Sequence, residues 1–500
     1  MRRGWRLALA GGLLALGPAA AQLAPPTSPT LQDQLNGWFS RAARVAPGEW
    51  GVAVADDQGR LLWSVNAGNP LIPASTVKLF TTGFARSTLG GEARQTTRVV
   101  GTGYVEPLSG AWIGTWALEL NGDPTFERPM RQGATVRDLA AGLAAIGIRR
   151  LDGPLTVQST QGVAEATYPA VWAGRHRGRS FAPLVGPLTL NENLISFTLS
   201  PGAEVGAAPV VTASAPIGMD GLVRISAKTV AGTRDRLRIL AAPGGRFEIQ
   251  GTIGIKARPR GYTGTARDLG VVLEAAWEAA LREAGIVWER HAALAIRPGA
   301  IGEFTLAEVV SPPLDSIVAE VNTRSLNIGA EALLRWAGGP SDQAAERLTA
   351  HVRQVTGESQ VHLVDGSGLS GDDRATAYSF VKYLGTLPGT PAGRNFPFLL
   401  PANGDGTLKR LTSSKLSPGV VRAKTGTLGN VASLVGYLGH KDGLLLVSVL
   451  YNGSQVSAAK QQQWQLFRVL GADGTTIPGE SAGSSLGGEA SEPPPEPGAR

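Results

Sequence analysis

The feature that most constrains this 500-residue chain is a change of sequence pattern in its middle. From about residue 93 to 263, short β-like runs are punctuated by glycine and proline, with one helical stretch among them. A hairpin pattern and an apolar helix precede this segment, and helices followed by three consecutive strands come after it. We therefore expect one discontinuous domain, residues 22–92 and 264–473, interrupted by a β-rich insertion over residues 93–263.

The two ends of the chain have compositions unlike that of a folded domain. Residues 1–21 carry arginines, then a short uncharged run, then three alanines before Gln22, which is the order found in a secretory signal peptide. The uncharged run is too short to cross a bilayer. Residues 474–500 are rich in glycine, serine, proline and glutamate, so we expect them to be disordered. The sequence thus predicts export to the periplasm or cell envelope, with no transmembrane anchor after signal cleavage.

The composition narrows the possible chemistry. The chain has no cysteine, which excludes disulfides and a thiol nucleophile. Its five histidines are scattered without a His-x-x-x-His pair, so neither a metal site nor any other cofactor is predicted. In an exported protein, the net charge of +7 fits an anionic envelope better than nucleic acid, although a generally solvated basic surface explains it equally well.

Three Ser-x-x-Lys patterns occur, at residues 75–78, 379–382 and 457–460. Only the first follows a proline at a helix opening and precedes an apolar turn. Residues three apart share one face of a helix, so Lys78 would lie beside Ser75. A buried lysine near another cation loses its charge more readily and can then accept the proton of the serine. The free N–H groups of the helix start would stabilise an oxyanion there.

Two further motifs follow in the order that a serine–lysine hydrolase needs. Ser-Leu-Asn at residues 325–327 precedes an apolar helical run, and Lys-Thr-Gly-Thr at residues 424–427 lies in a predicted strand. Each has a plain structural explanation when taken alone, because serine and asparagine cap helices and Lys-Thr-Gly can end a strand in a turn. Found together, in this order and on these elements, the three motifs point to catalysis by Ser75.

With these motifs the chain resembles serine penicillin-binding proteins of the D-alanyl-D-alanine carboxypeptidase/endopeptidase family, the low-molecular-mass class C type. The similarity runs roughly from residue 31 to 470 and includes the segments 120–126, 188–202 and 364–370. Members of this family carry a large insertion between the first and second motifs. The resemblance implies an α/β fold of the β-lactamase/transpeptidase type: an antiparallel sheet flanked by helices, an all-helical subdomain and a β-rich inserted module.

The resemblance also implies roles for the matching positions. Ser75 would be the acylated nucleophile, Lys78 its proton acceptor, and Ser325 the relay of the proton to the leaving D-alanine. Backbone N–H groups of Ser75 and Thr427 would form the oxyanion hole, and a glycine at 426 would leave room for the substrate backbone. The residues expected to bind substrate are Asn327, Lys424, Thr425, Gly426 and Thr427.

Two more segments bear on the site. The stretch Asp365–Gly368 is expected to be a turn that supports it. In relatives, the wall of the insertion can present an acid to a cationic side chain of the substrate, but the corresponding stretch here has Arg175, His176, Arg177 and Arg179 and no acid. If it faces the substrate, it would repel an ammonium group and favour a neutral or anionic one. A solvated loop that touches anionic wall polymers explains it equally well.

The resemblance implies a serine-type D-Ala-D-Ala carboxypeptidase that acts on peptidoglycan stem peptides and is trapped covalently by β-lactam antibiotics. Whether it also cleaves D-alanyl cross-links, as an endopeptidase does, is left open. One alternative is a β-lactamase, although residues 328–423 contain no Glu-x-x-x-Asn pattern to supply a deacylating base. The other is a non-catalytic penicillin-binding or wall-binding receptor, against which the complete set of motifs argues.

Overall fold

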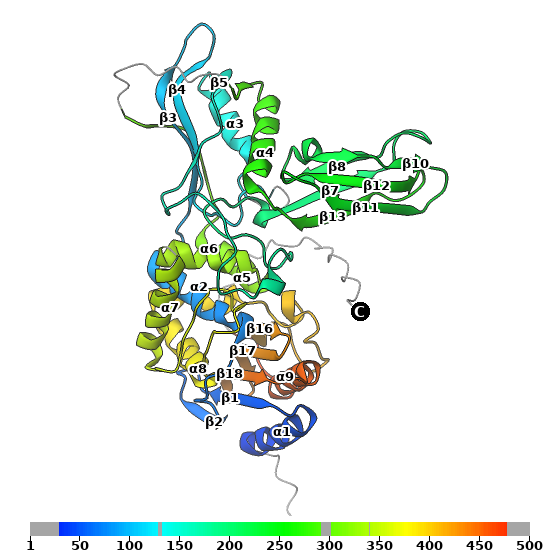
Figure 1. Cartoon of the computed structure of the whole chain (residues 1–500). Coiled ribbons are helices and arrows are strands. Elements are labelled where there is room, and N and C mark those ends of the chain that lie inside the picture. The colour runs from blue at the N-terminus through cyan, green and yellow to red at the C-terminus, as the bar shows by residue number, and fades with distance from the viewer. Residues whose placement is uncertain (1–29, 129–132, 292–301, 340, 478–500) are drawn as a thin grey trace, which may run out of the picture.

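A five-stranded antiparallel sheet joins the two ends of the chain, as the sequence pattern predicts (Figure 1). The structure is a computed structural model that describes residues 30–128, 133–291, 302–339 and 341–477. In spatial order the strands are β16 (Val421–Leu428), β17 (Val431–His440), β18 (Gly443–Asn452), β1 (Glu49–Ala55) and β2 (Leu61–Val65).

Helices cover both faces of this sheet, and the alternation of side chains along β1 separates the two cores. Val52 and Val54 belong to a core shared with α1 (Leu31–Val45) and α9 (Val456–Leu470). Ala53 and Ala55 point the opposite way, into a core built with helices of the other face. Those helices are α2 (Val77–Leu89), α5 (Leu314–Arg324), α6 (Asn327–Gly338), α7 (Ser341–Thr356) and α8 (Ala377–Thr386).

The interposed region forms a second body above the first in Figure 1. One of its sheets has the order β15-β3-β4-β6, and two strands, β14 and β5, pair in parallel beside it. The rest of the interposed body contains two further sheets, one with the order β13-β7-β8 and one with the order β10-β12-β11. Strand β9 also pairs with β12. The elements are β3 (Thr96–Val105), β4 (Trp112–Glu119), α3 (Val136–Ala145), β5 (Arg150–Asp152), β6 (Val157–Gln158), β7 (Leu194–Ser200), β8 (Val210–Ala215), β9 (Val223–Ile225), β10 (Lys228–Val230), β11 (Asp235–Ala241), β12 (Phe247–Gly254), β13 (Arg260–Thr265), α4 (Leu269–Glu283), β14 (Val287–Glu289) and β15 (Phe304–Val310).

Short 3₁₀ helices punctuate the loops of both bodies. They are η1 (Ala74–Thr76), η2 (Gly174–His176), η3 (Asn191–Asn193), η4 (Met219–Leu222), η5 (Leu387–Gly389), η6 (Pro391–Gly393), η7 (Phe396–Leu399) and η8 (Gly406–Leu408). The first of them carries the expected nucleophile.

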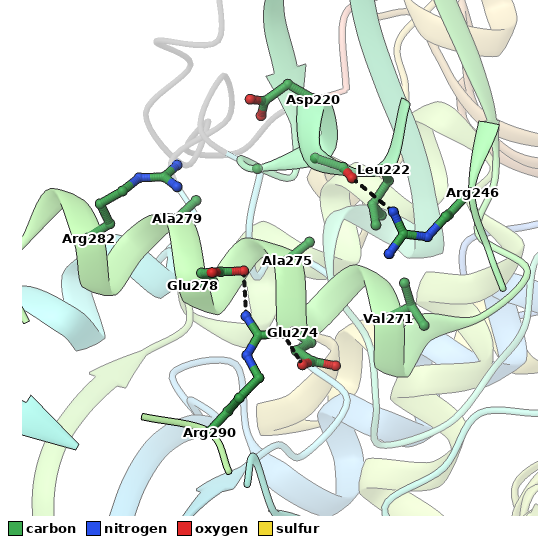
Figure 2. A pocket seen from close by; sticks show the side chains of 12 residues that line it. Asp220, Leu222, Arg246, Val271, Glu274, Ala275, Glu278, Ala279, Arg282 and Arg290 are labelled. Carbon is green, nitrogen blue, oxygen red and sulfur yellow. Dashed lines mark hydrogen bonds and ion pairs between the residues drawn. The ribbon is translucent and has the colours of Figure 1, made fainter. Parts of the chain in front are cut away.

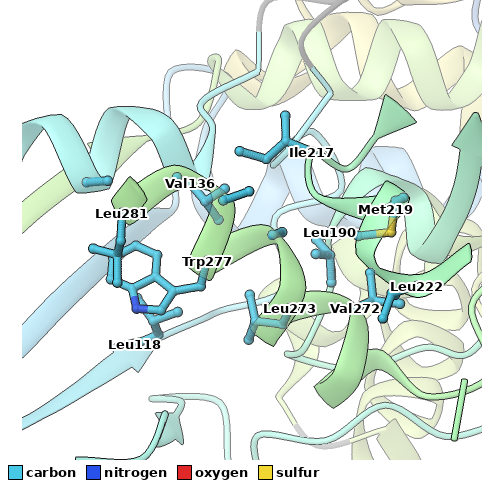
Figure 3. Packing of buried hydrophobic residues seen from close by; sticks show 14 of the residues in the cluster. Leu118, Val136, Leu190, Ile217, Met219, Leu222, Val272, Leu273, Trp277 and Leu281 are labelled. Atoms are coloured by element: carbon cyan, nitrogen blue, oxygen red, sulfur yellow. The ribbon is translucent and has the colours of Figure 1, made fainter. Parts of the chain in front are cut away.

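The interposed body continues past residue 263, where the sequence pattern placed its end. Trp277 of α4 is fully buried and packs in one core with Leu118 of β4 and Val136 of α3 (Figure 3). Strand β15 then pairs antiparallel with β3. The apolar face of α4 is thus buried against α3 and β4, and the edge of β3 is paired with β15. Both α4 and β15 therefore belong to the interposed body and not to the domain of the five-stranded sheet. We therefore propose that the insertion runs from about residue 93 to about 311.

The chain stays packed beyond residue 473, the expected end of the folded domain. Ile477 is only 5% exposed, its backbone N–H donates to the carbonyl of Gly419, and Thr476 Oγ1 donates to the carbonyl of Pro418. Residues 478–500 of the expected tail and the expected signal peptide, residues 1–21, lie outside the described residues. In the part of the chain that the structure describes, no helix combines the length and apolar character needed to cross a membrane.

Candidate active site

Ser75 lies in η1, a single 3₁₀ turn that opens directly into α2. The residue before it, Ala74, has φ of 50°, a left-handed conformation that a non-glycine residue adopts only where its surroundings impose it. One constraint comes from β17, where Ser433 Oγ donates to the carbonyl of Pro73 at 2.6 Å. A second comes from the turn at Gly368, which packs so closely that a Cβ there would come within 2.0 Å of the carbonyl oxygen of Ala74. The backbone that leads into Ser75 is therefore held in one conformation.

Lys78 is fully buried one helical turn below Ser75 and makes three hydrogen bonds through Nζ. The acceptors are Ser75 Oγ at 3.0 Å, Asn327 Oδ1 at 2.7 Å and the carbonyl oxygen of Ser367 at 2.6 Å. Burial lowers the pKa of Lys78 to about 8, against the opposing charges of three nearby carboxyl groups. About a tenth of this lysine is then neutral at pH 7, which is enough to accept a proton from the serine it contacts.

Of the three carboxyl groups around Lys78, the sequence pointed only to Asp365, as part of a turn expected to support the site, and not to Glu331 or Asp373. Glu331 on α6 accepts the backbone N–H groups of Gly366 and Ser367. Asp365 accepts three backbone N–H groups of the same turn, and Asp373 accepts that of Val364. Burial is the main cause that raises the pKa of Glu331, to about 8, and that of Asp373. The turn is thus tied to the helix that carries Asn327, and its Ser367 carbonyl is held against Lys78.

Ser325 and Lys424 form the second pair of the site. Lys424 is fully buried, and its Nζ donates to Ser325 Oγ at 2.8 Å and to the carbonyl of Thr425 at 2.9 Å. Burial, followed by the charge of Lys78, lowers the pKa of Lys424 well below its usual range. Ser325 ends α5 in a left-handed conformation, with φ of 60°, and its side chain does not cap a helix. Its hydroxyl is therefore available for proton transfer.

The end of α5 next to Ser325 is pinned by a buried ion network from the interposed body. Arg128 Nε contacts Glu192 Oε1 at 2.9 Å, and a second arm of Arg128 contacts Glu320 on α5. Arg324 donates to Glu192 Oε2 at 3.0 Å and to Glu320 Oε1 at 2.8 Å. Burial opposes the ionisation of Glu320, but these guanidinium groups outweigh it and hold its pKa at about 2. The network fixes the residue that immediately precedes Ser325.

Asn327 is the first residue of α6, and its side chain bridges the two bodies. Its Oδ1 accepts from Lys78, while its Nδ2 donates to the carbonyl of Phe181 in the loop that follows β6. Trp172 anchors the same loop, since it is 1% exposed and its Nε1 donates to Asp365 Oδ2 at 3.1 Å. Helix capping was the plain alternative for Asn327, and its side chain makes no such cap. The loop therefore forms one wall of the site.

The basic residues of this loop lie on its outer side. Arg175, Arg177 and Arg179 are exposed, and His176 is half-buried with a pKa lowered by burial and by Arg175. They occupy the stretch between Trp172, which docks on the site, and the carbonyl of Phe181, which contacts Asn327. The loop thus brings positive charge to the rim of the site. This position is compatible with both interpretations of the loop made from the sequence: repulsion of an ammonium group on the substrate, and contact with anionic wall polymers.

Strand β16 supplies the remaining predicted residues along the edge of the sheet. Thr425 and Thr427 share one face of the strand, half-buried and exposed respectively. Because β16 is the outermost strand, its free edge can pair with an extended peptide. The first part of that edge is already used, since Ala423 N–H donates to the carbonyl of Pro401. The part from Lys424 onward lies beside Ser75.

The reason for a glycine at position 426 differs from the one expected. A Cβ there would lie 2.1 Å from Ser433 Oγ, 2.8 Å from the carbonyl oxygen of Pro73 and 3.0 Å from the backbone N of Ser75. The glycine is therefore required by the protein's own nucleophile turn, which packs directly on β16. The expected room for the substrate backbone stays a prediction beside this contact.

We expect Gly426→Ala to destabilise the fold by about 1–3 kcal/mol, because the added methyl group overpacks this contact. It should also slow acylation of Ser75, since the added methyl group would press on the carbonyl oxygen of Pro73 and on the backbone N of that serine, 3.0 Å away. Gly429→Ala is the matched control, because nothing lies within 4 Å of a Cβ at that position. Urea unfolding and labelling by a fluorescent penicillin measure both effects. Equal behaviour of the two variants would contradict the packing argument.

Of the other two Ser-x-x-Lys patterns, one has a structural role and the other begins at the surface. Ser379 is fully buried at the start of α8, where its Oγ donates to the carbonyl of Thr376, and Lys382 pairs with Glu358. Ser457 is exposed in the first turn of α9. Among the residues that the structure describes, no group of three or more His, Cys, Asp or Glu side chains is arranged to hold a metal ion.

Comparison with known proteins agrees with this geometry. The chain is 26% identical over 428 residues to a D-alanyl-D-alanine carboxypeptidase of Actinomadura sp. (strain R39), covering 81% of this chain and 77% of that protein. It is 28% identical over 407 residues to a carboxypeptidase of Mycobacterium tuberculosis, covering 78% of this chain and 72% of the relative.

A solved structure of similar fold is penicillin binding protein 4 (dacB) from Haemophilus influenzae. The two superpose with a TM-score of 0.68 at 20% identity, covering 87% of this chain and 99% of the other. This likeness confirms the predicted fold class. The model of the D-Ala-D-Ala carboxypeptidase 3 (S13) family matches residues 32–471. The chain therefore belongs to the S13 family of D-Ala-D-Ala carboxypeptidases, serine-type peptidases.

Proposed function

We propose that this protein is a serine-type D-alanyl-D-alanine carboxypeptidase that acts on peptidoglycan stem peptides through an acyl-enzyme on Ser75. The observation that carries the proposal is the contact, at 3.0 Å, between Nζ of the fully buried Lys78 and Oγ of the partly buried Ser75. A serine hydroxyl is a weak nucleophile until an adjacent base takes its proton. A buried lysine with a pKa of about 8 can do so near neutral pH.

Acylation would begin with the peptide extended along the free edge of β16. Ser75 Oγ attacks the carbonyl carbon of the penultimate D-alanine as its proton passes to neutral Lys78. The negative charge that develops on the carbonyl oxygen would be stabilised by the backbone N–H groups of Ser75 and Thr427. Thr425 and Thr427 would hold the terminal carboxylate, and Lys424 would supply positive potential beside it.

Collapse of the tetrahedral intermediate breaks the peptide bond to the terminal D-alanine. The leaving amine needs a proton, and Ser325 is placed to relay one because its Oγ is hydrogen-bonded to Lys424. Asn327 keeps Lys78 aligned throughout, since its Oδ1 lies 2.7 Å from Nζ. Water then hydrolyses the ester and frees Ser75. A β-lactam would follow the same first step, but its leaving amine stays attached through the opened ring, which favours a long-lived adduct.

The proposal extends to location and organisation. Residues 1–21 would be a signal peptide that directs export to the periplasm or cell envelope, where the substrate polymer lies. Residues 22–92 and the chain after about residue 311 would form the penicillin-binding domain, with the insertion between them. The family and the basic rim of the site support this location.

One experiment separates the three candidate functions. The purified mature protein is incubated with labelled penicillin, with a peptide that ends in D-alanyl-D-alanine, and with a cross-linked stem-peptide dimer. A long-lived adduct together with D-alanine release supports the carboxypeptidase, and cleavage of the dimer adds endopeptidase activity. Rapid turnover of penicillin would identify a β-lactamase, whereas an adduct without peptide cleavage would identify a receptor.

A further inference from the structure

A cavity of about 470 Å³ lies where the interposed body meets the far end of α6. Its walls come from four places in the chain: the segment before β3, the end of β4, the loop after β6 and the last turn of α6. The side chains that matter for recognition are Arg94, Gln95, Gln161, Arg335 and Trp336. Cavities of this size accept ligands as large as a disaccharide or a short peptide.

The lining has positive charge, amide groups and one large aromatic face. Two arginines and no acidic residue line the cavity among the described residues. Arg94 donates one Nη1–H to the carbonyl of Ser311 and has further N–H groups that point to no described partner. Gln95 is 5% exposed, and its Oε1 is buried without a hydrogen-bond partner among the described residues. Arg94 and Trp336 suit a ligand that carries a carboxylate and a ring to stack on the indole.

The walls are also held in place. Asn121 Oδ1 accepts the backbone N–H of Thr160 and the hydroxyl of Ser159, while its Nδ2 donates to the carbonyl of Thr96. One buried amide thus ties β3, β4 and the loop after β6 together. A site held this firmly loses little conformational entropy when it binds a ligand.

A second cavity in the interposed body shows what an internally balanced lining looks like. It measures about 160 Å³ and lies between α4 and η4 (Figure 2). Arg290 forms salt bridges with Glu274 and Glu278 there, and Arg246 donates to the carbonyl of Gly221. Three acidic residues and three arginines line this cavity, so the formal charges of its lining cancel. The larger cavity differs because no acidic residue is among the described residues that line it.

The spacing between this cavity and the active site matches the length of a stem peptide. Asn327 begins α6 beside Lys78, and Arg335 lies eight residues later, about 12 Å along the helix axis. A peptide of four or five residues spans about 13–18 Å when extended. A stem whose C-terminal end lies at Ser75 is therefore long enough for its sugar-bearing end to reach the cavity.

We propose that this cavity binds the sugar-bearing end of the stem peptide, with the amino-sugar ring on Trp336 and the carboxylate of the acidic second stem residue on Arg94. The inference rests on the proposed function, because it takes the stem peptide as the substrate. It assigns to this chain a preference for stems that are still attached to glycan over free peptides.

The first test measures binding without catalysis. The probe is a disaccharide attached to the first two stem residues, which lacks D-alanine and cannot be cleaved. We expect isothermal titration calorimetry to detect its binding to the intact protein, and the affinity to fall about tenfold or more in Arg94→Gln and in Trp336→Leu. The wild-type protein should bind a probe whose carboxylate is converted to a carboxamide more weakly than the original probe. Arg94→Gln should bind the two probes with equal affinity. Absence of binding, or equal binding by all three proteins, would overturn the inference.

The second test measures selectivity in turnover. We expect kcat/KM for D-alanine release to be about tenfold higher for the disaccharide-linked pentapeptide than for the free pentapeptide, with the difference in KM. Arg94→Gln and Trp336→Leu should remove this preference and leave turnover of the free peptide and penicillin labelling unchanged, which also verifies folding. Equal loss on both substrates would overturn the inference. If the wild-type protein releases no D-alanine from any peptide, the proposed function fails, and the calorimetry still decides whether the cavity binds its probe.

Discussion

Ser75→Ala is expected to abolish covalent labelling by penicillin and to lower D-alanine release by a factor on the order of 10⁴ or more. The expectation follows from the geometry, because Ser75 Oγ is the only acceptor of Lys78 Nζ that can act as a nucleophile; the other two are an amide and a backbone carbonyl oxygen. The variant keeps the backbone of η1 and loses one partly buried hydroxyl, so the protein should still fold. Reversible binding of penicillin should therefore remain measurable.

The chain offers its own matched control for this variant. Ser457 has the same spacing to a lysine, Lys460, but lies exposed on α9. Ser457→Ala should label and release D-alanine like the wild-type protein. Gel fluorescence with a labelled penicillin and a D-alanine assay measure both variants. Labelling that survives in Ser75→Ala, or that disappears in Ser457→Ala, would show that another residue is the nucleophile.

The sheet and its flanking helices could be predicted because their signals are local or alternate regularly. Strand β1 alternates between two cores, and Val52 and Val54 on one face against Ala53 and Ala55 on the other mark a strand buried on both sides. The pairing of β1 with β18 followed from the order of elements, since a hairpin at one end and strands at the other need a common sheet.

The end of the insertion could not be predicted in the same way. Helix α4 has a clear apolar stripe, but a stripe does not say which of two cores it will join. The choice is made by Trp277, which packs with α3 and β4, and by β15, which pairs with β3 across a long stretch of chain. Neither contact leaves a mark in the local sequence.

The residues of the site also divide into those that the sequence could predict and those that only tertiary packing reveals. Ser75, Lys78, Ser325 and Lys424 could be selected because the chemistry requires those residue types on those elements. Glu331 could have been noticed, because it lies four residues after Asn327 and so shares its helix face. Asp365 was expected only as part of a turn that supports the site, and Asp373 looks like an ordinary turn residue in the sequence. Their charge beside Lys78 comes from burial, which only the tertiary structure creates.

The buried lysine leads to the second large effect. Lys78→Met should lower the rate of Ser75 acylation by a factor of about 10³ to 10⁴, because methionine fills a similar volume but cannot accept a proton. In the wild-type protein the rate should rise with pH up to about 8, since burial sets the pKa of Lys78 near that value and the neutral form increases as pH rises through it. Glu331 titrates in the same range, so the pH profile reports the combined titration of Lys78 and Glu331 and not that of Lys78 alone.

The variant should lose this pH dependence as well as the rate, and the two losses together separate a base from a merely structural lysine. A structural role would lower the rate and leave the shape of the profile intact. Lys382→Met is the control, because Lys382 occupies the same position in a Ser-x-x-Lys pattern but pairs with Glu358 away from the site. Second-order rate constants for penicillin labelling between about pH 6 and 10 give the profiles. If Lys78→Met acylates within tenfold of the wild-type rate, or keeps the rise toward pH 8, the proton of Ser75 must leave through another group, and Ser325 with Lys424 would be the pair to examine.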